Sequence, residues 1–80
     1  MEVSKIKMTW LVMEFKGKHN RKYKIRMFAD GPYQFYEGGK WVYEMKGEIA
    51  LQEMIKDVGR KGGHLVYAAN ENGTITSNNI

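Results

Sequence analysis

The chain has 80 residues, which allows one domain with one hydrophobic core and excludes a second domain. It has no cysteine, which excludes a disulfide framework and a thiolate zinc site, so packing must stabilise the fold, with homodimer formation as a second source of stability. Residues 1–28 hold eight basic and two acidic residues, a net charge of +6, whereas residues 29–80 hold five and seven, a net charge of −2. This separation of charge favours an anionic partner, although a solvated strand pair can show the same pattern.

The N-terminal segment predicts a long strand with a bulge or bend at Trp10. Apolar residues alternate through Ile6 and Met8 up to Trp10, and the alternation then changes phase and continues from Leu11 to Phe15. The longest apolar run is only residues 10–13, which is too short for a signal peptide or a membrane span. We therefore expect a cytoplasmic protein that does not contact a membrane.

The next segment predicts a basic β-hairpin. Residues 17–20 have the composition of a turn, and the chain then alternates strictly between apolar and basic residues. One face of this strand carries Tyr23, Ile25 and Met27, and the other carries Lys22, Lys24 and Arg26. The three cations are therefore expected to lie together on one side of the sheet.

Two more strands should complete an antiparallel meander of about four strands. Residues 30–32 (Asp-Gly-Pro) break the chain, a short aromatic strand covers residues 33–37, and Gly38-Gly39 is typical of a two-residue hairpin turn. After that turn, Trp41, Tyr43 and Met45 alternate with polar or smaller residues. We expect the residues of this series to face the core.

An amphipathic helix follows, because the apolar spacing changes to Leu51, Met54, Ile55 and Val58. Gly62-Gly63 can end it, and a strand at residues 64–69, a turn at 70–73 and a short strand at 74–76 follow. The polar tail, residues 77–80, is a candidate for disorder. The predicted fold class is α+β in a single domain (1–80), with a curved antiparallel meander, one helix packed on one face and one or two further strands. The predicted core consists of Ile25, Met27, Trp41, Tyr43, Leu51, Met54, Ile55, Val58, Leu65 and Tyr67.

Catalysis has little support in the sequence. Cysteine is absent, and the two serines, Ser4 and Ser77, lie near the chain ends, where a nucleophile is difficult to hold in place. His19 and His64 could supply the acid and base of a small metal-free ribonuclease, although both are more typical of surface histidines. We expect a protein that is not an enzyme, with no metal and no cofactor.

Gly59-Arg60-Lys61-Gly62 matches the G-x-x-G loop with which KH domains hold a nucleic-acid backbone. The same four residues fit the C-terminal cap of the predicted helix, which is the simpler interpretation. A KH loop joins two helices, whereas a strand is predicted to follow here. Arg60 and Lys61 nevertheless remain candidate contacts for an anion.

The remaining signal combines cations with aromatic residues on neighbouring predicted strands. Rings can stack on bases and cations can hold phosphates, although several rings must form the core. Alternation indicates Phe28 and Tyr36 as exposed, with Phe35 or Tyr33 as further candidates. The predicted binding residues are Lys16, Lys18, Arg21, Lys22, Lys24, Arg26, Phe28, Tyr36, Arg60 and Lys61.

The leading hypothesis is a non-catalytic module that binds nucleic acid through the basic hairpin with little sequence specificity. The alternative is a protein-binding adaptor or inhibitor, for example a mobile-element protein that blocks a host enzyme, with the hairpin on an acidic protein surface. A ribonuclease is the third hypothesis. Partner pull-down after nuclease treatment separates the first two.

Overall fold

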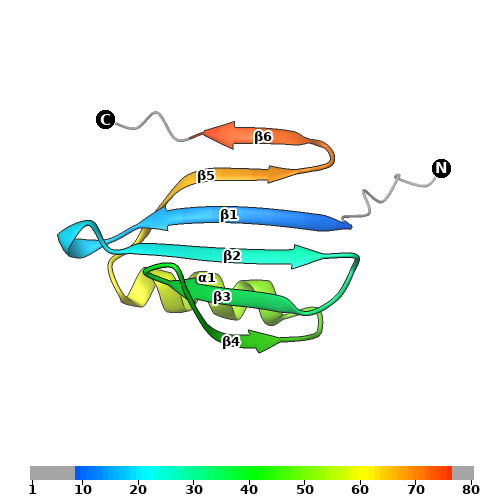
Figure 1. Cartoon of the computed structure of the whole chain (residues 1–80), viewed down its shortest axis with the longest axis horizontal. Helices are drawn as coiled ribbons and strands as arrows, with labels where there is room; N and C mark the ends of the chain where they lie inside the picture. Colours follow the sequence, from blue (N-terminus) through cyan, green and yellow to red (C-terminus); the bar gives the residue numbers. More distant parts are fainter. Residues whose placement is uncertain (1–8, 77–80) are drawn as a thin grey trace.

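The computed structural model describes residues 9–76. In this part of the chain, six strands and one α-helix form a two-layer α+β fold (Figure 1). The elements are β1 (Trp10–Lys16), a 3-10 turn (Lys18–Asn20), β2 (Lys22–Phe28), β3 (Tyr33–Glu37), β4 (Lys40–Met45), α1 (Ala50–Arg60), β5 (His64–Asn70) and β6 (Gly73–Thr76). The predicted fold class is confirmed. The tail predicted at 77–80, and the part of the first strand predicted before residue 9, lie outside the described residues.

The six strands form one antiparallel sheet in the order β4-β3-β2-β1-β5-β6. Strands β1 to β4 follow one another as the predicted meander. Helix α1 then carries the chain back across the sheet, so that β5 lies on the other side of β1 (Figure 1). The hairpin of β1 and β2, which holds six of the thirteen basic residues, therefore lies in the middle of the sheet.

The β3–β4 hairpin closes through Gly38 and Gly39, whose φ angles of 61° and 83° are both in the left-handed region. The predicted two-residue turn needs such angles at both positions, and glycine adopts them without steric cost. The pairing shifts between Phe35 and Tyr36, so that Tyr36 lies opposite Trp41. This bulge puts Trp41 out of phase with the rest of β4. Its predicted core position is wrong, because the residue is 55% exposed.

Helix α1 packs on the sheet through Ala50, Met54 and Val58, which are buried and spaced four residues apart. Leu51 beside them is partly buried against the core. Ile55 was also predicted to be a core residue, but it is 39% exposed. A residue one step from Met54 is rotated by about 100° around the helix axis, which turns Ile55 towards solvent.

Glycine ends the helix as predicted. Gly62 has a φ of 82°, and its N–H donates to the Gly59 carbonyl at 3.0 Å, while the Gly63 N–H donates to the Val58 carbonyl at 2.9 Å. This pair of bonds is a Schellman motif. A Cβ on Gly63 would lie 2.4 Å from Cγ1 of Val58, so glycine lets the chain pass close to the helix on its way into β5. The segment 59–62 is therefore a helix cap and does not join two helices, as a KH loop would.

The core lies between α1 and the sheet. Phe35 is fully buried at its centre, and its ring centroid lies 5.0 Å from that of Tyr43 and 6.1 Å from that of Tyr23. Phe35 was predicted as a candidate for exposure, which is wrong, because β3 pairs with β2 in a register that places it opposite the buried Ile25. Of the predicted core residues, Ile25, Met27, Met54 and Val58 are buried, and Tyr43, Leu51 and Leu65 are partly buried against them.

Glu71 in the β5–β6 turn fixes the start of β1. Its carboxylate accepts hydrogen bonds from the backbone N–H groups of Thr9 (2.7 Å) and Trp10 (3.3 Å) and from the Thr9 hydroxyl. These bonds, led by the one from the hydroxyl, lower the pKa of Glu71 to about 2. The contact therefore stabilises the fold fully above the unfolded-state pKa and is lost only as the pH falls towards 2.

Candidate functional site

The face of the sheet opposite α1, which we call the outer face, collects the cations of the basic hairpin. Ile25 in β2 is fully buried on the helix side, and strand alternation places its two neighbours, Lys24 and Arg26, on the outer face. Lys22 and Phe28 continue the same column and are exposed. Successive residues of such a column are about 7 Å apart.

Cross-strand pairing arranges the outer-face residues in rows. The central row runs from β5 to β4 and consists of Tyr67, Glu14, Lys24, Tyr36 and Trp41. The row on one side consists of His64, Lys16 and Lys22, and the row on the other side of Ala69, Val12, Arg26, Gln34 and Glu44. Tyr67 was predicted to be a core residue, and this is wrong, because its pairing with Glu14 places it on the outer face.

Arg26 is held between two aromatic rings. Its guanidinium carbon lies 5.2 Å from the ring centroid of Phe28 and 5.1 Å from that of Tyr36. Its Nε donates to Oε1 of Gln34 (3.3 Å), and the Tyr36 hydroxyl donates to the same oxygen (3.4 Å). These contacts hold the arginine in place, yet within residues 9–76 it has no ion-pair partner. Its charge is therefore available to an anion.

The lysines on this face are close to one another. Lys16 and Lys22 lie directly opposite each other in the β1–β2 pair. Nζ of Lys24 lies 6.0 Å from the Tyr36 ring centroid. None of the three forms an ion pair with an acidic residue in the described range. Like charges directly opposite each other destabilise a sheet, and a bound anion would relieve that repulsion.

Two hollows lie beside these lysines. The first, of about 510 Å³, is lined by Glu14, Phe15, Lys16, Lys22, Tyr23, Lys24, Tyr36, Gly39 and Val66. The second, of about 520 Å³, is lined by His19, Asn20, Arg21, Lys22, Gly38 and Gly39. They share Lys22 and Gly39, so they adjoin each other at the end of the β2 column. Each is large enough for a small ligand, for which pockets of about 300 to 1,000 Å³ are usual.

The predicted binding residues divide into two groups. Those brought together on the outer face are Lys16, Lys22, Lys24, Arg26, Phe28 and Tyr36. Lys18 instead lies against Gly62, since its Cε would be 3.1 Å from a Cβ built there. Arg60 is exposed in the last turn of α1, on the other side of the sheet.

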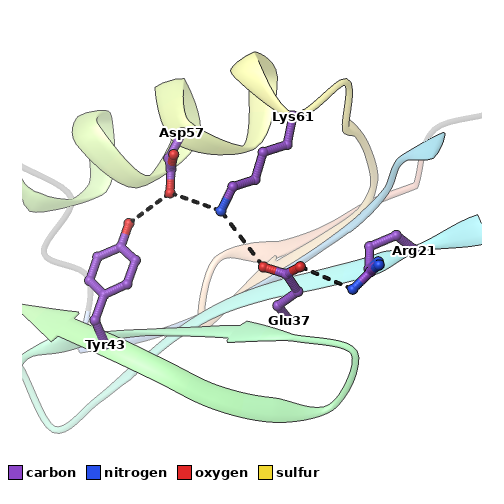
Figure 2. A network of polar contacts seen from close by, with 5 residues as sticks. All are labelled: Arg21, Glu37, Tyr43, Asp57 and Lys61. Atoms are coloured by element: carbon purple, nitrogen blue, oxygen red, sulfur yellow. Dashed lines mark hydrogen bonds and ion pairs between the residues drawn. The ribbon is translucent and has the colours of Figure 1, made fainter.

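Arg21 and Lys61 belong to a polar network on the helix side (Figure 2). Glu37 pairs with Arg21 at 3.1 Å and with Lys61 at 3.6 Å, and Lys61 also pairs with Asp57 at 3.5 Å. The Tyr43 hydroxyl donates to Asp57 at 3.3 Å. The network links the end of α1 to β3 and β4, so these two cations have a structural role in docking the helix.

Burial is the main cause that raises the pKa of Tyr43, and the nearby Asp57 carboxylate adds to it. The stabilisation from the neutral hydroxyl is therefore complete below the unfolded-state pKa of about 10 and is lost as the pH rises through the higher folded-state value. We expect Tyr43→Phe to cost about 1 kcal/mol of unfolding free energy near neutral pH, and less as the pH rises to about 11.

Urea denaturation of both proteins between about pH 8 and pH 11 measures this difference. Tyr33→Phe is the matched control, because Tyr33 is also partly buried against the core but, within residues 9–76, forms no side-chain hydrogen bond to a carboxylate. A Tyr43→Phe cost that stays constant over the whole range would contradict the assignment.

The two histidines lie at the same end of the sheet. His19 is in the 3-10 turn with a φ of 57°, and His64 lies opposite Lys16. No side-chain hydrogen bond or ion pair in the described range joins either imidazole to another residue. The ribonuclease hypothesis stays a prediction.

Outer-face residues that were not predicted as part of the site include Glu14, Gln34, Trp41 and Tyr67. Glu14 and Tyr67 lie beside the cations only because β5 pairs with β1. Trp41 joins them because of the bulge in β4. Gln34 could have been placed from the sequence, because it lies two residues before Tyr36 on the same strand and so faces the same side of the sheet.

The described residues, 9–76, hold no cluster of three His, Asp or Glu side chains suited to a metal ion. None of the helices in that range has the length and apolar composition of a membrane span. Comparisons with models of protein families, with curated protein sequences and with solved structures yield no significant match. Function has therefore to be inferred from the outer face itself.

Proposed function

We propose that this protein binds single-stranded nucleic acid on the outer face of its sheet and is not an enzyme. The observation that carries the proposal is Arg26, held between the rings of Phe28 and Tyr36 in one column with two lysines. Single-strand binders combine such rings, on which bases stack, with cations along the path of the phosphates.

The exposure of the rings favours unpaired bases as the ligand. Phe28 is 50% exposed, and Trp41 at the other end of the surface is also exposed. In a duplex the bases already stack on one another, so the faces of these rings can be used only by bases that are unpaired. The lysines that line the two adjoining hollows provide positive charge for the phosphates of the nucleic-acid backbone.

The test measures the binding of fluorescent oligothymidylate and oligouridylate to the wild type and to Phe28→Ala by anisotropy. Stacking on one ring contributes about 1 to 3 kcal/mol per base, so Phe28→Ala should weaken binding by about tenfold. The slope of affinity against salt should not change, because the substitution removes no charge.

Ile49→Ala is the matched control, since Ile49 is an exposed apolar residue at the start of α1, away from the outer face. It should leave affinity unchanged. A wild-type protein that binds neither oligonucleotide would overturn the proposal. Equal losses of affinity in Phe28→Ala and Ile49→Ala would show that the nucleic acid does not stack on the Phe28 ring.

Strand β4 supports the second candidate function, a protein-binding module. It is an edge strand of the sheet, and Trp41 and Val42 on it are both exposed. An exposed edge can accept a strand from a partner, and tryptophan is enriched at interface hot spots. A stoichiometric protein partner that survives nuclease treatment and is lost in Trp41→Ala would favour this function over nucleic-acid binding.

A further inference from the structure

We infer that the hollow around Glu14 accepts a guanine base of the bound strand. The inference rests on the proposed single-strand binding and names the base that this part of the surface prefers. Glu14 is the acidic residue among those that line the hollow, and the other lining residues with polar side chains are Lys16, Lys22, Tyr23, Lys24 and Tyr36.

The position of Glu14 leaves its carboxylate available to a ligand. It lies opposite Lys24 on one side and Tyr67 on the other. Nζ of Lys24 lies over the Tyr36 ring at 6.0 Å, and no described lysine forms an ion pair with Glu14. The carboxylate is exposed and can turn into the hollow.

A carboxylate repels a polyanion, and hydrogen-bond donors on the ligand can offset this repulsion. Ionised Glu14 only accepts hydrogen bonds, and it has two oxygens to do so. Among the standard bases, guanine alone has two adjacent donors, N1–H and the N2 amino group, on its Watson–Crick edge. A two-bond contact of this kind therefore selects guanine over adenine, cytosine, uracil and thymine.

The surroundings fit the rest of a nucleotide. Tyr36 lies two strands away from Glu14, about 10 Å across the sheet, and its partly exposed side chain also lines the hollow. Lys16 and Lys22 form the next row, about 7 Å along the strands, where the flanking phosphates would lie. Gly39, which also lines the hollow, has no side chain to fill it.

The experiment compares oligothymidylates in which one central base is replaced by guanine, hypoxanthine, adenine or cytosine. Hypoxanthine lacks only the N2 amino group, so it removes one donor and keeps the shape. The wild type should bind the guanine oligonucleotide about fivefold more tightly than the hypoxanthine one. Glu14→Gln should lose this preference and bind plain oligothymidylate more tightly, because a negative charge is gone.

Glu44→Gln is the matched control, since Glu44 lies on the same face opposite Gln34. It should strengthen binding to every oligonucleotide and keep the guanine preference. Equal strengthening of all oligonucleotides by Glu14→Gln, or a wild type that does not separate guanine from hypoxanthine, would overturn the inference and leave the proposed function standing.

Two results would count against the proposed function instead. A wild-type protein that binds none of the oligonucleotides would overturn both the proposed single-strand binding and the guanine site. Free guanosine monophosphate binding as tightly as the guanine oligonucleotide, with the same loss in Glu14→Gln, would support the guanine site and overturn strand binding.

Discussion

The triple substitution Lys22→Gln, Lys24→Gln and Arg26→Gln should lower the affinity for oligothymidylate by on the order of a hundredfold at low salt. The three cations form one column on β2, and none has an acidic partner in the described range. Each released counterion contributes about 0.7 to the slope of log affinity against log salt for a single strand, so the slope should fall by about 2. Anisotropy titrations at several salt concentrations measure both quantities.

The matched control is Lys46→Gln, Lys56→Gln and Arg60→Gln. It changes the net charge by the same amount, but Lys56 and Arg60 are exposed on α1 and Lys46 lies just after β4. Affinity and salt slope should fall much less. Equal effects from both triple variants would mean that the affinity for the oligonucleotide depends only on the net charge of the protein. That result would contradict the proposal that the outer face is the binding surface.

The substitution Phe35→Ala should lower the free energy of unfolding by about 3 to 5 kcal/mol. Phe35 is fully buried, and it contacts the rings of Tyr23 and Tyr43. A domain of this size has a total stability of roughly 4 to 12 kcal/mol, so the loss is a large part of it. Thermal unfolding followed by circular dichroism should show a Tm lower by roughly 15 to 30 °C.

Phe28→Ala is the control for this experiment too, because it removes the same side chain from the opposite face of the sheet. Phe28 is half exposed and contacts Arg26, so its loss should cost less than about 1 kcal/mol. The two variants should thus separate stability from binding: Phe35→Ala destabilises the fold, and Phe28→Ala weakens the binding of single-stranded nucleic acid. Similar losses of Tm in both would contradict the assignment of the two faces.

The two faces also separate the cations by role. On the outer face, the ring contacts of Arg26 hold it without neutralising it. On the helix side, Lys61 pairs with Glu37 and Asp57 and lies over the rings of Tyr23 and Phe35, which ties α1 to the sheet. The cations are therefore divided between the proposed binding surface and a structural contact.

Several features of the fold could be predicted because they depend on residues close together in the chain. The alternation of Lys22, Lys24 and Arg26 with apolar residues is enough to place them on one face of a strand. Gly38-Gly39 is enough for a tight hairpin, and Gly62 is enough to end the helix, because each supplies a backbone angle that other residues avoid. These local signals predicted the elements and the central column of the proposed binding surface.

Other features were decided by contacts between distant residues. Glu14 faces Tyr67 because β5 pairs with β1, and no pattern within either segment indicates that pairing. A one-residue bulge turned Trp41 from the core to the outer face, since a shift of one position exchanges the two faces of a strand. The sequence by itself therefore determined the basic column, whereas the tertiary structure decided which rings and which carboxylate lie beside it, because strand register depends on pairing across the whole sheet.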